Sequence, residues 1–174
     1  MEIFNFYQPT RLHFGVGRLV EIGKIVAKYS NKCMLITTNN DEDVLRPLYD
    51  RVKGYLAEAG VDVVHFDEVV PNPVIKGIEK AINIIHSEDV GVVLGLGGGS
   101  SIDTAKSVAL FHDAGAVDWD EVFGEYTDPF AEYELPGGQP LPLIAVPTTS
   151  GTGSELTQAM VISDPDADRK ECIF

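Results

Sequence analysis

Apolar residues fall into two kinds of pattern along this chain. Short and almost continuous apolar runs, flanked by glycine, proline and polar residues, predict buried strands. These runs cover residues 32–38, 61–66, 90–94 and 143–146. Between them, apolar residues recur every three or four positions, as they do on one face of a helix. Helices are predicted at residues 19–29, 44–59 and 74–85, with a fourth from about residue 101 to residue 112.

The alternation of strands and helices decides the fold class. Strands that are separated by helices are usually parallel, and strands this apolar are buried on both faces. We therefore predict an α/β fold in which a parallel sheet carries helices on both faces. In such sheets ligands bind outside the carboxyl ends of the strands, so the residues that follow the predicted strands are expected to converge on one crevice.

The regions outside this alternation differ from one another. Residues 12–17 read as a strand that ends in a glycine turn. Residues 159–163 and 170–174 predict two extra strands near the C-terminus, with a turn at residues 164–168. The last residues are apolar and carry no polar tail, so we expect the natural protein to continue beyond Phe174.

A long acidic segment separates the fourth predicted helix from the last strand of the sheet. Residues 114–139 are too many for a simple connection, and we interpret them as an insertion with one short helix near residues 118–123. Seven carboxylates lie between Asp118 and Glu134. A metal site is one interpretation of such a cluster. These carboxylates show no ligand spacing, however, so a solvated surface loop is favoured.

The composition is that of a globular protein with an acidic surface. A chain of 174 residues suffices for one domain with a sizeable core, so residues 1–174 are interpreted as a single domain. The formal charge of −14 argues against nucleic acid and anionic membranes as partners, because both need a basic surface. No apolar run is long enough for a membrane span. The N-terminus lacks the features of a signal peptide, and Cys33 and Cys172 lack metal-ligand spacing, so we expect a cytoplasmic location.

A glycine-rich turn between the strand at residues 90–94 and the next helix carries candidate chemistry. Gly97, Gly98 and Gly99 would let the backbone approach an anion, the helix N-terminus offers unpaired N–H groups, and Ser100 adds a hydroxyl. We interpret it as the phosphate-binding turn of a dinucleotide-binding domain; the alternative is a tight turn with close strand–helix packing. It is not the usual dinucleotide fingerprint, because it follows the fourth strand and leads into the acidic segment.

Asp103, in the first turn of the following helix, has two interpretations. It is either a favourable charge at the helix N-terminus or a functional residue that faces a neutral amide or hydroxyl of the ligand. No other residue is a candidate for catalysis. The four histidines show no metal-ligand pairing, and no nucleophile, histidine and acid have a spacing that supports a triad.

A second loop, rich in hydroxyl groups, follows the last strand of the predicted sheet. Such small donors could wrap the ribose and phosphates from the far side of the crevice; the alternative is a simple polar turn. Six of them fall within ten residues, at Thr148, Thr149, Ser150, Thr152, Ser154 and Thr157.

The tip of the strand at residues 32–38 bears on the choice of cofactor. A carboxylate there would bind a ribose 2′-hydroxyl and repel a 2′-phosphate. Here Thr38 and Asn39 are neutral, and acids begin only at Asp41. The tip leaves room for a 2′-phosphate, which favours NADP over NAD.

Together these motifs resemble the iron-containing (group III) alcohol dehydrogenases. The resemblance implies an N-terminal Rossmann-like domain that binds NAD or NADP, and a helical C-terminal domain in which one aspartate and three histidines hold iron or zinc. It also implies hydride transfer between an alcohol or aldehyde and the nicotinamide. The match rests on GGGSSIDTAK at residues 97–106, PTTSGTGSE at residues 147–155, FYQPT at residues 6–10, Phe14-Gly15 and Asn72-Pro73.

The same resemblance implies roles for individual residues. The glycine turn would hold the pyrophosphate, the hydroxyl-rich loop would line the cofactor, and Asp103 would lie near the nicotinamide. Lys170 would reach a ribose hydroxyl. Thr38 or Asn39 would face the adenine ribose, with Asn72 nearby. The candidate cofactor-binding residues are Thr38, Asn39, Asn72, Gly97, Gly98, Gly99, Ser100, Asp103, Thr148, Thr149, Ser154, Thr157 and Lys170.

The resemblance places all four metal ligands beyond Phe174. We therefore expect this chain to be a truncated or proteolytic piece of a longer enzyme and to be inactive alone. Two other classes stay open: a stand-alone nucleotide-binding module without catalysis, and a kinase of the phosphofructokinase type, in which only Asp103 could help to position Mg²⁺. Family members often form dimers, and residues 12–15 could pair across a two-fold axis.

Overall fold

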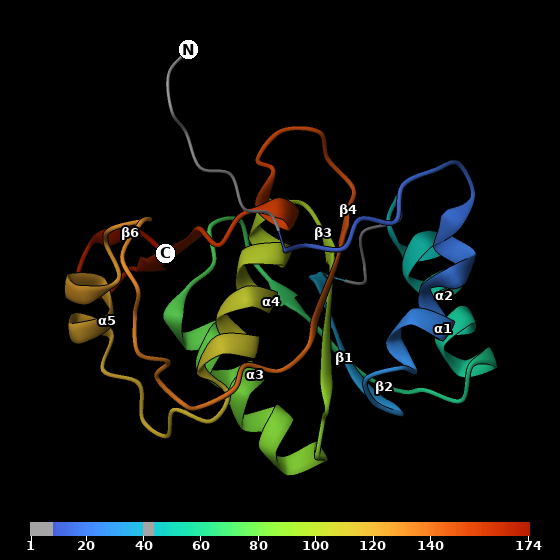
Figure 1. Cartoon of the computed structure of the whole chain (residues 1–174), viewed down its shortest axis with the longest axis horizontal. Helices are drawn as coiled ribbons and strands as arrows, with labels where there is room; N and C mark the ends of the chain where they lie inside the picture. The colour runs from blue at the N-terminus through green and yellow to red at the C-terminus, as the bar shows by residue number, and fades with distance from the viewer. Residues whose placement is uncertain (1–8, 40–43) are drawn as a thin grey trace.

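The computed structural model describes residues 9–39 and 44–174 (Figure 1). The predictions that concern residues 6–8 and Asp41 lie outside these ranges. Within them, no helix combines the length and the apolar character needed to cross a membrane.

Four parallel strands form the central sheet. They lie in the order β2-β1-β3-β4, and every neighbouring pair is parallel. The prediction of an α/β fold built on a parallel sheet is confirmed, because each apolar run became one of these strands. Their bounds are β1 (Lys32–Thr38), β2 (Asp62–Val69), β3 (Val92–Gly97) and β4 (Leu143–Pro147).

Helices cover both faces of the sheet (Figure 1). The side chains of β1 alternate between the two layers: Cys33 and Leu35 are buried on the face of α1 and α2, and Met34 and Ile36 on the face of α3 and α4. This double burial explains the continuous apolar run of β1. The first face carries the 3-10 helix η1 (Arg18–Glu21), α1 (Ile22–Val26) and α2 (Arg46–Glu58), and the second carries α3 (Ile75–Glu88) and α4 (Gly99–Phe111).

The two predicted C-terminal strands form a hairpin of their own. β5 (Met160–Asp164) and β6 (Arg169–Ile173) pair antiparallel as a separate sheet. Met160, Ile162 and Ile173 are buried in the same core as α4, so the hairpin is held against this helix. A short 3-10 helix, η2 (Ser154–Leu156), lies in the loop that leads to it.

The acidic segment contains one short helix, as predicted. This helix, α5 (Trp119–Glu125), begins at an Asp118 N-cap whose side chain accepts from two backbone N–H groups. Trp119 is buried and its ring lies 5.3 Å from the ring of Phe111 on α4, between centroids. The aromatic contacts attach α5 to the core, while the interpretation of residues 114–139 as an insertion stays a prediction.

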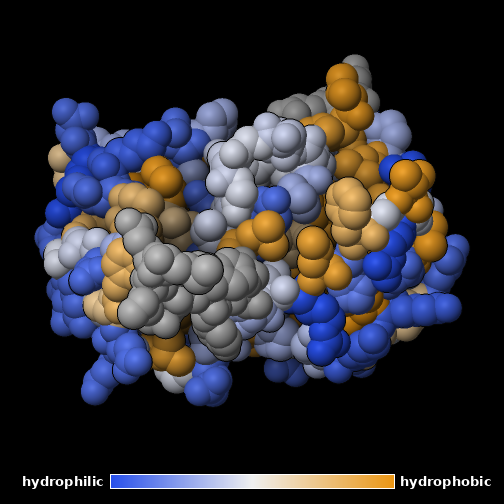
Figure 2. Space-filling view, turned by 45° about the horizontal axis from the view of Figure 1, so that its top comes forward, coloured by the Kyte–Doolittle hydropathy of each residue, from blue (hydrophilic) through white to orange (hydrophobic). Residues whose placement is uncertain are grey.

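The prediction of a strand at residues 12–17 is wrong. This stretch is irregular up to Phe14 and turns from Gly15. Its apolar side chains are exposed, with Leu12 at 65% and Phe14 at 86%, and it pairs with no strand among the described residues. An alternating pattern is not enough to form a strand without a neighbour to pair with. Figure 2 shows exposed apolar groups on the side of the molecule that carries α1 and α2.

The boundaries at the glycine turn also differ from the prediction. β3 continues through Gly97, and α4 begins at Gly99 with Gly98 as its N-cap, two residues earlier than expected. Gly97 has φ 151°, and a Cβ there would lie 2.5 Å from Ser101 Oγ. The glycines therefore also allow the close strand–helix approach that was the alternative interpretation of this turn.

Candidate functional site

The turn between β3 and α4 presents a helix N-terminus at the carboxyl edge of the sheet. The first backbone bond of the turn runs from Ile102 N to Gly98 O (3.2 Å). The N–H groups before Ile102 therefore have no acceptor within the helix, and they add to the positive end of its dipole. Such a terminus suits an anion that can come close to the backbone.

The hydroxyl-rich loop folds directly onto this turn. Thr148 N donates to Gly97 O at 2.9 Å, which continues the pairing of β3 with β4. A Cβ on Gly99 would lie 2.9 Å from Thr152 Cγ2, so glycine is needed for the loop to lie this close. The two loops that the sequence singled out thus lie against each other, and Thr148, Thr149 and Thr157 of the hydroxyl-rich loop are exposed.

Three predicted residues from separate elements meet beside the turn. Asn72 N donates to Ser100 Oγ at 3.2 Å, and Lys170 Nζ donates to Asn72 Oδ1 at 2.6 Å. Asn72 has φ 60°, a left-handed conformation that asparagine tolerates better than most residues. Lys170 on β6 therefore brings a positive charge to the first turn of α4, where an anion would be stabilised.

The tip of β1 lies at the same edge but is engaged with its own neighbours. Thr38 Oγ1 lies 2.8 Å from the hydroxyl of Tyr49. Thr37 Oγ1 donates to Thr38 O (2.7 Å) and lies 2.9 Å from His65 Nε2, so the Nε2–H tautomer of His65 would donate to Thr37. Burial lowers the pKa of His65, which favours this neutral form. Asn39 follows Thr38 and is exposed.

Asp103 lies beyond the first turn of α4, contrary to the prediction, because the helix begins at Gly99. Both Asp103 and Ser154 lie inside the protein. Only 8% of Asp103 is exposed, and its carboxylate accepts from Ser154 Oγ and from Val161 N (3.1 Å). Asp103 Oδ1 also lies 3.1 Å from Lys106 Nζ. These contacts give Asp103 and Ser154 an internal role in holding the loop. Their predicted contacts with a cofactor stay predictions.

Lys106 is a residue whose role the sequence did not reveal. Its ammonium is buried beside Asp103 and donates to backbone carbonyls of the hydroxyl-rich loop. Burial lowers the pKa of Lys106, while the charge of Asp103 opposes this shift. The available signal was an Asp and a Lys three residues apart on an otherwise buried helix, a spacing that places both on one face.

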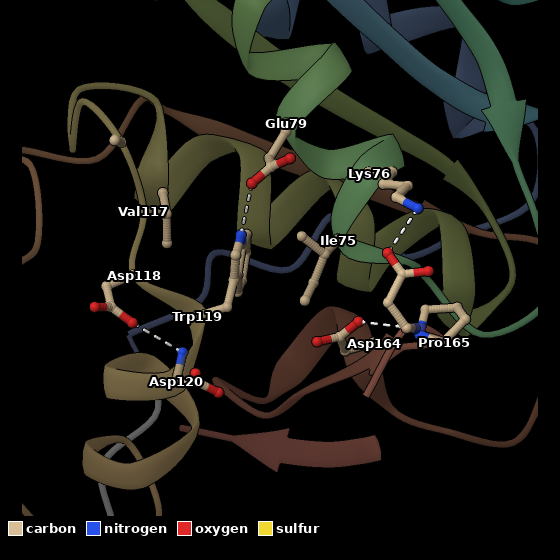
Figure 3. A pocket seen from close by; sticks show the side chains of 11 residues that line it. Ile75, Lys76, Glu79, Val117, Asp118, Trp119, Asp120, Asp164 and Pro165 are labelled. Atoms are coloured by element: carbon tan, nitrogen blue, oxygen red, sulfur yellow. Dashed lines mark hydrogen bonds and ion pairs between the residues drawn. The ribbon is translucent and has the colours of Figure 1, made fainter. Parts of the chain in front are cut away.

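A separate cavity of about 660 Å³ lies between α3, the start of α5 and the turn of the β5–β6 hairpin (Figure 3). Five carboxylates and a single lysine line it, which disfavours a phosphate. Each carboxylate has a protein partner, including Glu79 with Trp119 Nε1 (2.9 Å) and Asp166 with Lys76 Nζ (2.7 Å). Within the described residues no three His, Cys, Asp or Glu side chains are grouped as a metal site would need.

Comparisons with known proteins agree on one family. A family model described as iron-containing alcohol dehydrogenase matches residues 9–174. A choline dehydrogenase of Bacillus subtilis is 33% identical over 98% of this chain and 41% of its own length, and a probable NADH-dependent butanol dehydrogenase of the same organism is 35% identical over the same shares. The crystal structure of an NADH-dependent butanol dehydrogenase from Thermotoga maritima superposes with a TM-score of 0.85 and is 30% identical.

These matches cover nearly all of this chain but less than half of each relative. The Thermotoga structure is matched over 99% of this chain but only 41% of its own chain. The chain thus spans about two-fifths of the length of the curated relatives it matches.

Proposed function

Because the chain belongs to the iron-containing alcohol dehydrogenase family, we propose that it is the NAD(P)-binding part of a metal-dependent alcohol dehydrogenase. The observation that carries the proposal is the arrangement at the N-terminus of α4. There the glycine turn, the hydroxyl-rich loop and the Ser100–Asn72–Lys170 contacts converge. Small backbone-lined turns of this kind, with one cation nearby, suit a pyrophosphate.

The residues present fit a dinucleotide by two further features. Gly99 leaves the backbone of the turn uncovered by a side chain, and a Cβ there would lie 2.9 Å from Thr152 Cγ2. Ser101 Oγ, in the first turn of α4, is buried without a hydrogen-bond partner among the described residues, which is rare for a buried hydroxyl. An unsatisfied donor at this turn is consistent with a site that polar ligand atoms or water complete.

We assign the parts of the cofactor as follows. The turn at Gly98, Gly99 and Ser100 would hold the pyrophosphate, with Lys170 and Asn72 beside it. The exposed hydroxyls of the 148–157 loop would bind the nicotinamide half, and the tip of β1 at Thr38 and Asn39 would face the adenine ribose. When bound, the nicotinamide ring supplies the hydride acceptor or donor. The part of this chain is to bind the dinucleotide and fix its orientation.

The choice between the two dinucleotides rests on the tip of β1. Thr37, Thr38 and Asn39 carry no charge, so nothing at these three positions repels a 2′-phosphate. We therefore propose that NADP binds at least as well as NAD. Titration with NADPH and NADH tests this directly, and a clear preference for NADH would reject it.

The metal implied by the family is not assigned to this chain. The described residues hold no group of three or more His, Cys, Asp or Glu side chains that could bind one. We propose that the ligands for iron or zinc lie in the part of the relatives that this chain does not cover, and that the chain alone binds cofactor without turnover. The longer protein would bind the alcohol or aldehyde substrate. We propose that it acts in the cytoplasm and forms a homodimer.

Two experiments test the proposal. A thermal-shift comparison of NADPH, NADH and ATP with Mg²⁺ should show stabilisation by the dinucleotides; stabilisation by ATP with Mg²⁺ alone would favour the kinase class instead. An assay of the longer parent protein with iron and a primary alcohol should show NAD(P)-dependent oxidation. Cofactor binding without any such activity would favour the stand-alone nucleotide-binding module.

A further inference from the structure

The ammonium of Lys106 lies inside the protein among oxygen atoms of the hydroxyl-rich loop. Its Nζ donates to the backbone carbonyls of Ser154 (3.0 Å), Thr157 (3.3 Å) and Ala159, and lies 3.1 Å from Asp103 Oδ1. Only 9% of the Lys106 side chain is exposed. A buried cation loses its hydration, and these oxygens replace it with charge-assisted hydrogen bonds. One side chain of α4 therefore binds three backbone carbonyls of the loop.

The same loop is attached to α4 and the glycine turn at other points. At its start, Thr148 N donates to Gly97 O at 2.9 Å. In its middle, Ser154 Oγ donates to Asp103 Oδ1, and after its end Val161 N donates to Oδ2 of the same carboxylate at 3.1 Å. Lys106 adds contacts with three backbone carbonyls between Thr148 and Val161. Without its ammonium, three backbone carbonyls in residues 154–159 would lose their donor.

The order of the strands places this loop relative to a bound dinucleotide. In the order β2-β1-β3-β4, the glycine turn follows β3, the tip of β1 lies on one side of it, and the loop after β4 lies on the other. A dinucleotide whose pyrophosphate sits at the turn extends to both sides. With its adenosine at the tip of β1, its nicotinamide half lies against the loop that Lys106 holds.

We propose that Lys106 is a positioning residue, whose ammonium holds the 148–159 loop in the conformation that receives the nicotinamide half of the dinucleotide. The inference rests on the proposed function, since it takes the turn before α4 as the pyrophosphate site. Lys106 acts through the loop and does not itself contact the cofactor. The adenosine half would be bound without any contribution from Lys106. Binding of the two halves can therefore be measured separately, which makes the role of Lys106 testable.

The test compares a dinucleotide with its adenosine half alone. The purified protein, the variant Lys106→Met and the control Lys80→Met are titrated with NADPH, NADH and ADP by calorimetry. Lys80 is a matched control because it forms an ion pair with Glu68 on the surface, with about half of each side chain exposed. Lys106→Met should bind the dinucleotides about tenfold more weakly or worse, because charge-assisted hydrogen bonds are lost. It should bind ADP as the unmodified protein does, and Lys80→Met should change neither.

Three outcomes overturn the inference. If Lys106→Met binds dinucleotides as well as the unmodified protein, Lys106 does not position the loop. If it loses ADP and dinucleotide equally, Lys106 serves the fold in general. If the unmodified protein binds neither dinucleotide, the proposed function fails and the inference fails with it. In the first two outcomes the unmodified protein still binds the dinucleotides, so the two failures can be told apart.

A second variant and a measurement without variants cover the case in which Lys106→Met does not fold. Lys106→Gln keeps two N–H donors without the charge, and it should show a smaller loss of dinucleotide binding than Lys106→Met; unchanged binding overturns the inference. In the unmodified protein, hydrogen exchange at Leu156 and Val161 should be slow before any nucleotide is added. Exchange there at the rate of an unstructured loop would show that the loop is not held.

Discussion

Lys170 Nζ donates a hydrogen bond to Asn72 Oδ1 at 2.6 Å, although 98 residues separate the two in sequence. The N–H of the same Asn72 donates to Ser100 Oγ at 3.2 Å. This pair therefore brings the β5–β6 hairpin to the first turn of α4. A cation reaches the place where the helix N-terminus already favours negative charge.

Removing this cation should weaken cofactor binding. Lys170→Met keeps much of the length of the side chain but loses the charge. We expect NADPH and NADH to bind at least about tenfold more weakly, because a charge-assisted contact is worth roughly 1.5–3 kcal/mol. Calorimetric titration measures the change. Lys76→Met is the control, since Lys76 forms a similarly exposed ion pair with Asp166, away from the turn. Equal affinities in both variants would show that Lys170 does not act at the cofactor site.

A methyl group at Gly99 should push the hydroxyl-rich loop away from the turn. Its Cβ would lie 2.9 Å from Thr152 Cγ2, and overpacking of this kind costs roughly 1–3 kcal/mol. We expect Gly99→Ala to lower both the free energy of unfolding and the affinity for the dinucleotide. Gly54→Ala is the matched control: a Cβ at this position of α2 meets nothing within 4 Å, so it should gain about 0.5–1 kcal/mol of stability. A stabilised Gly99→Ala with normal affinity would contradict the close seating of the loop.

Stability should fall in mild acid because of His65. Burial lowers the pKa of His65 in the folded protein below its ordinary value of 6.5. The unfolded chain therefore takes up its proton first as the pH falls. The contribution of neutral His65 to the free energy of unfolding is fully present above pH 6.5. It is lost as the pH falls from there towards the pKa of His65 in the folded protein.

Denaturant unfolding at about pH 7.5 and about pH 5.5 measures this effect. His65→Gln should reduce the difference in unfolding free energy between the two values, because the titrating group that contacts Thr37 is gone. His86→Gln, at an exposed position of α3, should leave the difference as it is. The prediction fails if both variants behave alike.

The two thiols should differ in reactivity. Cys33 is fully buried in β1, and burial raises its pKa to about 12, so almost no thiolate is present at neutral pH. Cys172 is exposed on β6. A thiol reagent should therefore label Cys172 in the native protein and both residues after unfolding, as peptide mapping would show. Rapid native labelling of Cys33 would mean that β1 is not buried as described.

Local pattern predicted most of the fold, and it failed where a long-range partner decides the outcome. β1 was predicted with its observed bounds because the apolar run at residues 33–36 is flanked by Lys32 on one side and by Thr37 and Thr38 on the other. Residues 12–17 carry a weaker version of such a pattern and form no strand, since no described strand pairs with them. The start of α4 was misplaced because glycine has no side chain whose periodicity could mark a helix.

In the candidate site, too, local sequence predicted some features, and others depend on long-range contacts. The glycine turn and the hydroxyl-rich loop could be found from the sequence, because unusual composition marks them, and the structure brings them together at Gly97 and Thr148. Asp103 could be found only as an acid near a helix N-terminus. Its engagement with Ser154 and Val161 depends on how residues more than fifty positions later fold back onto α4.

Calorimetric titration of the purified protein with NADPH, NADH and ATP plus Mg²⁺ tests the central claim most directly. Both dinucleotides should bind one to one, with NADPH at least as tight as NADH, and Gly99→Ala should weaken the binding of both. Binding of ATP with Mg²⁺ in the absence of any binding of NADPH or NADH would contradict this claim.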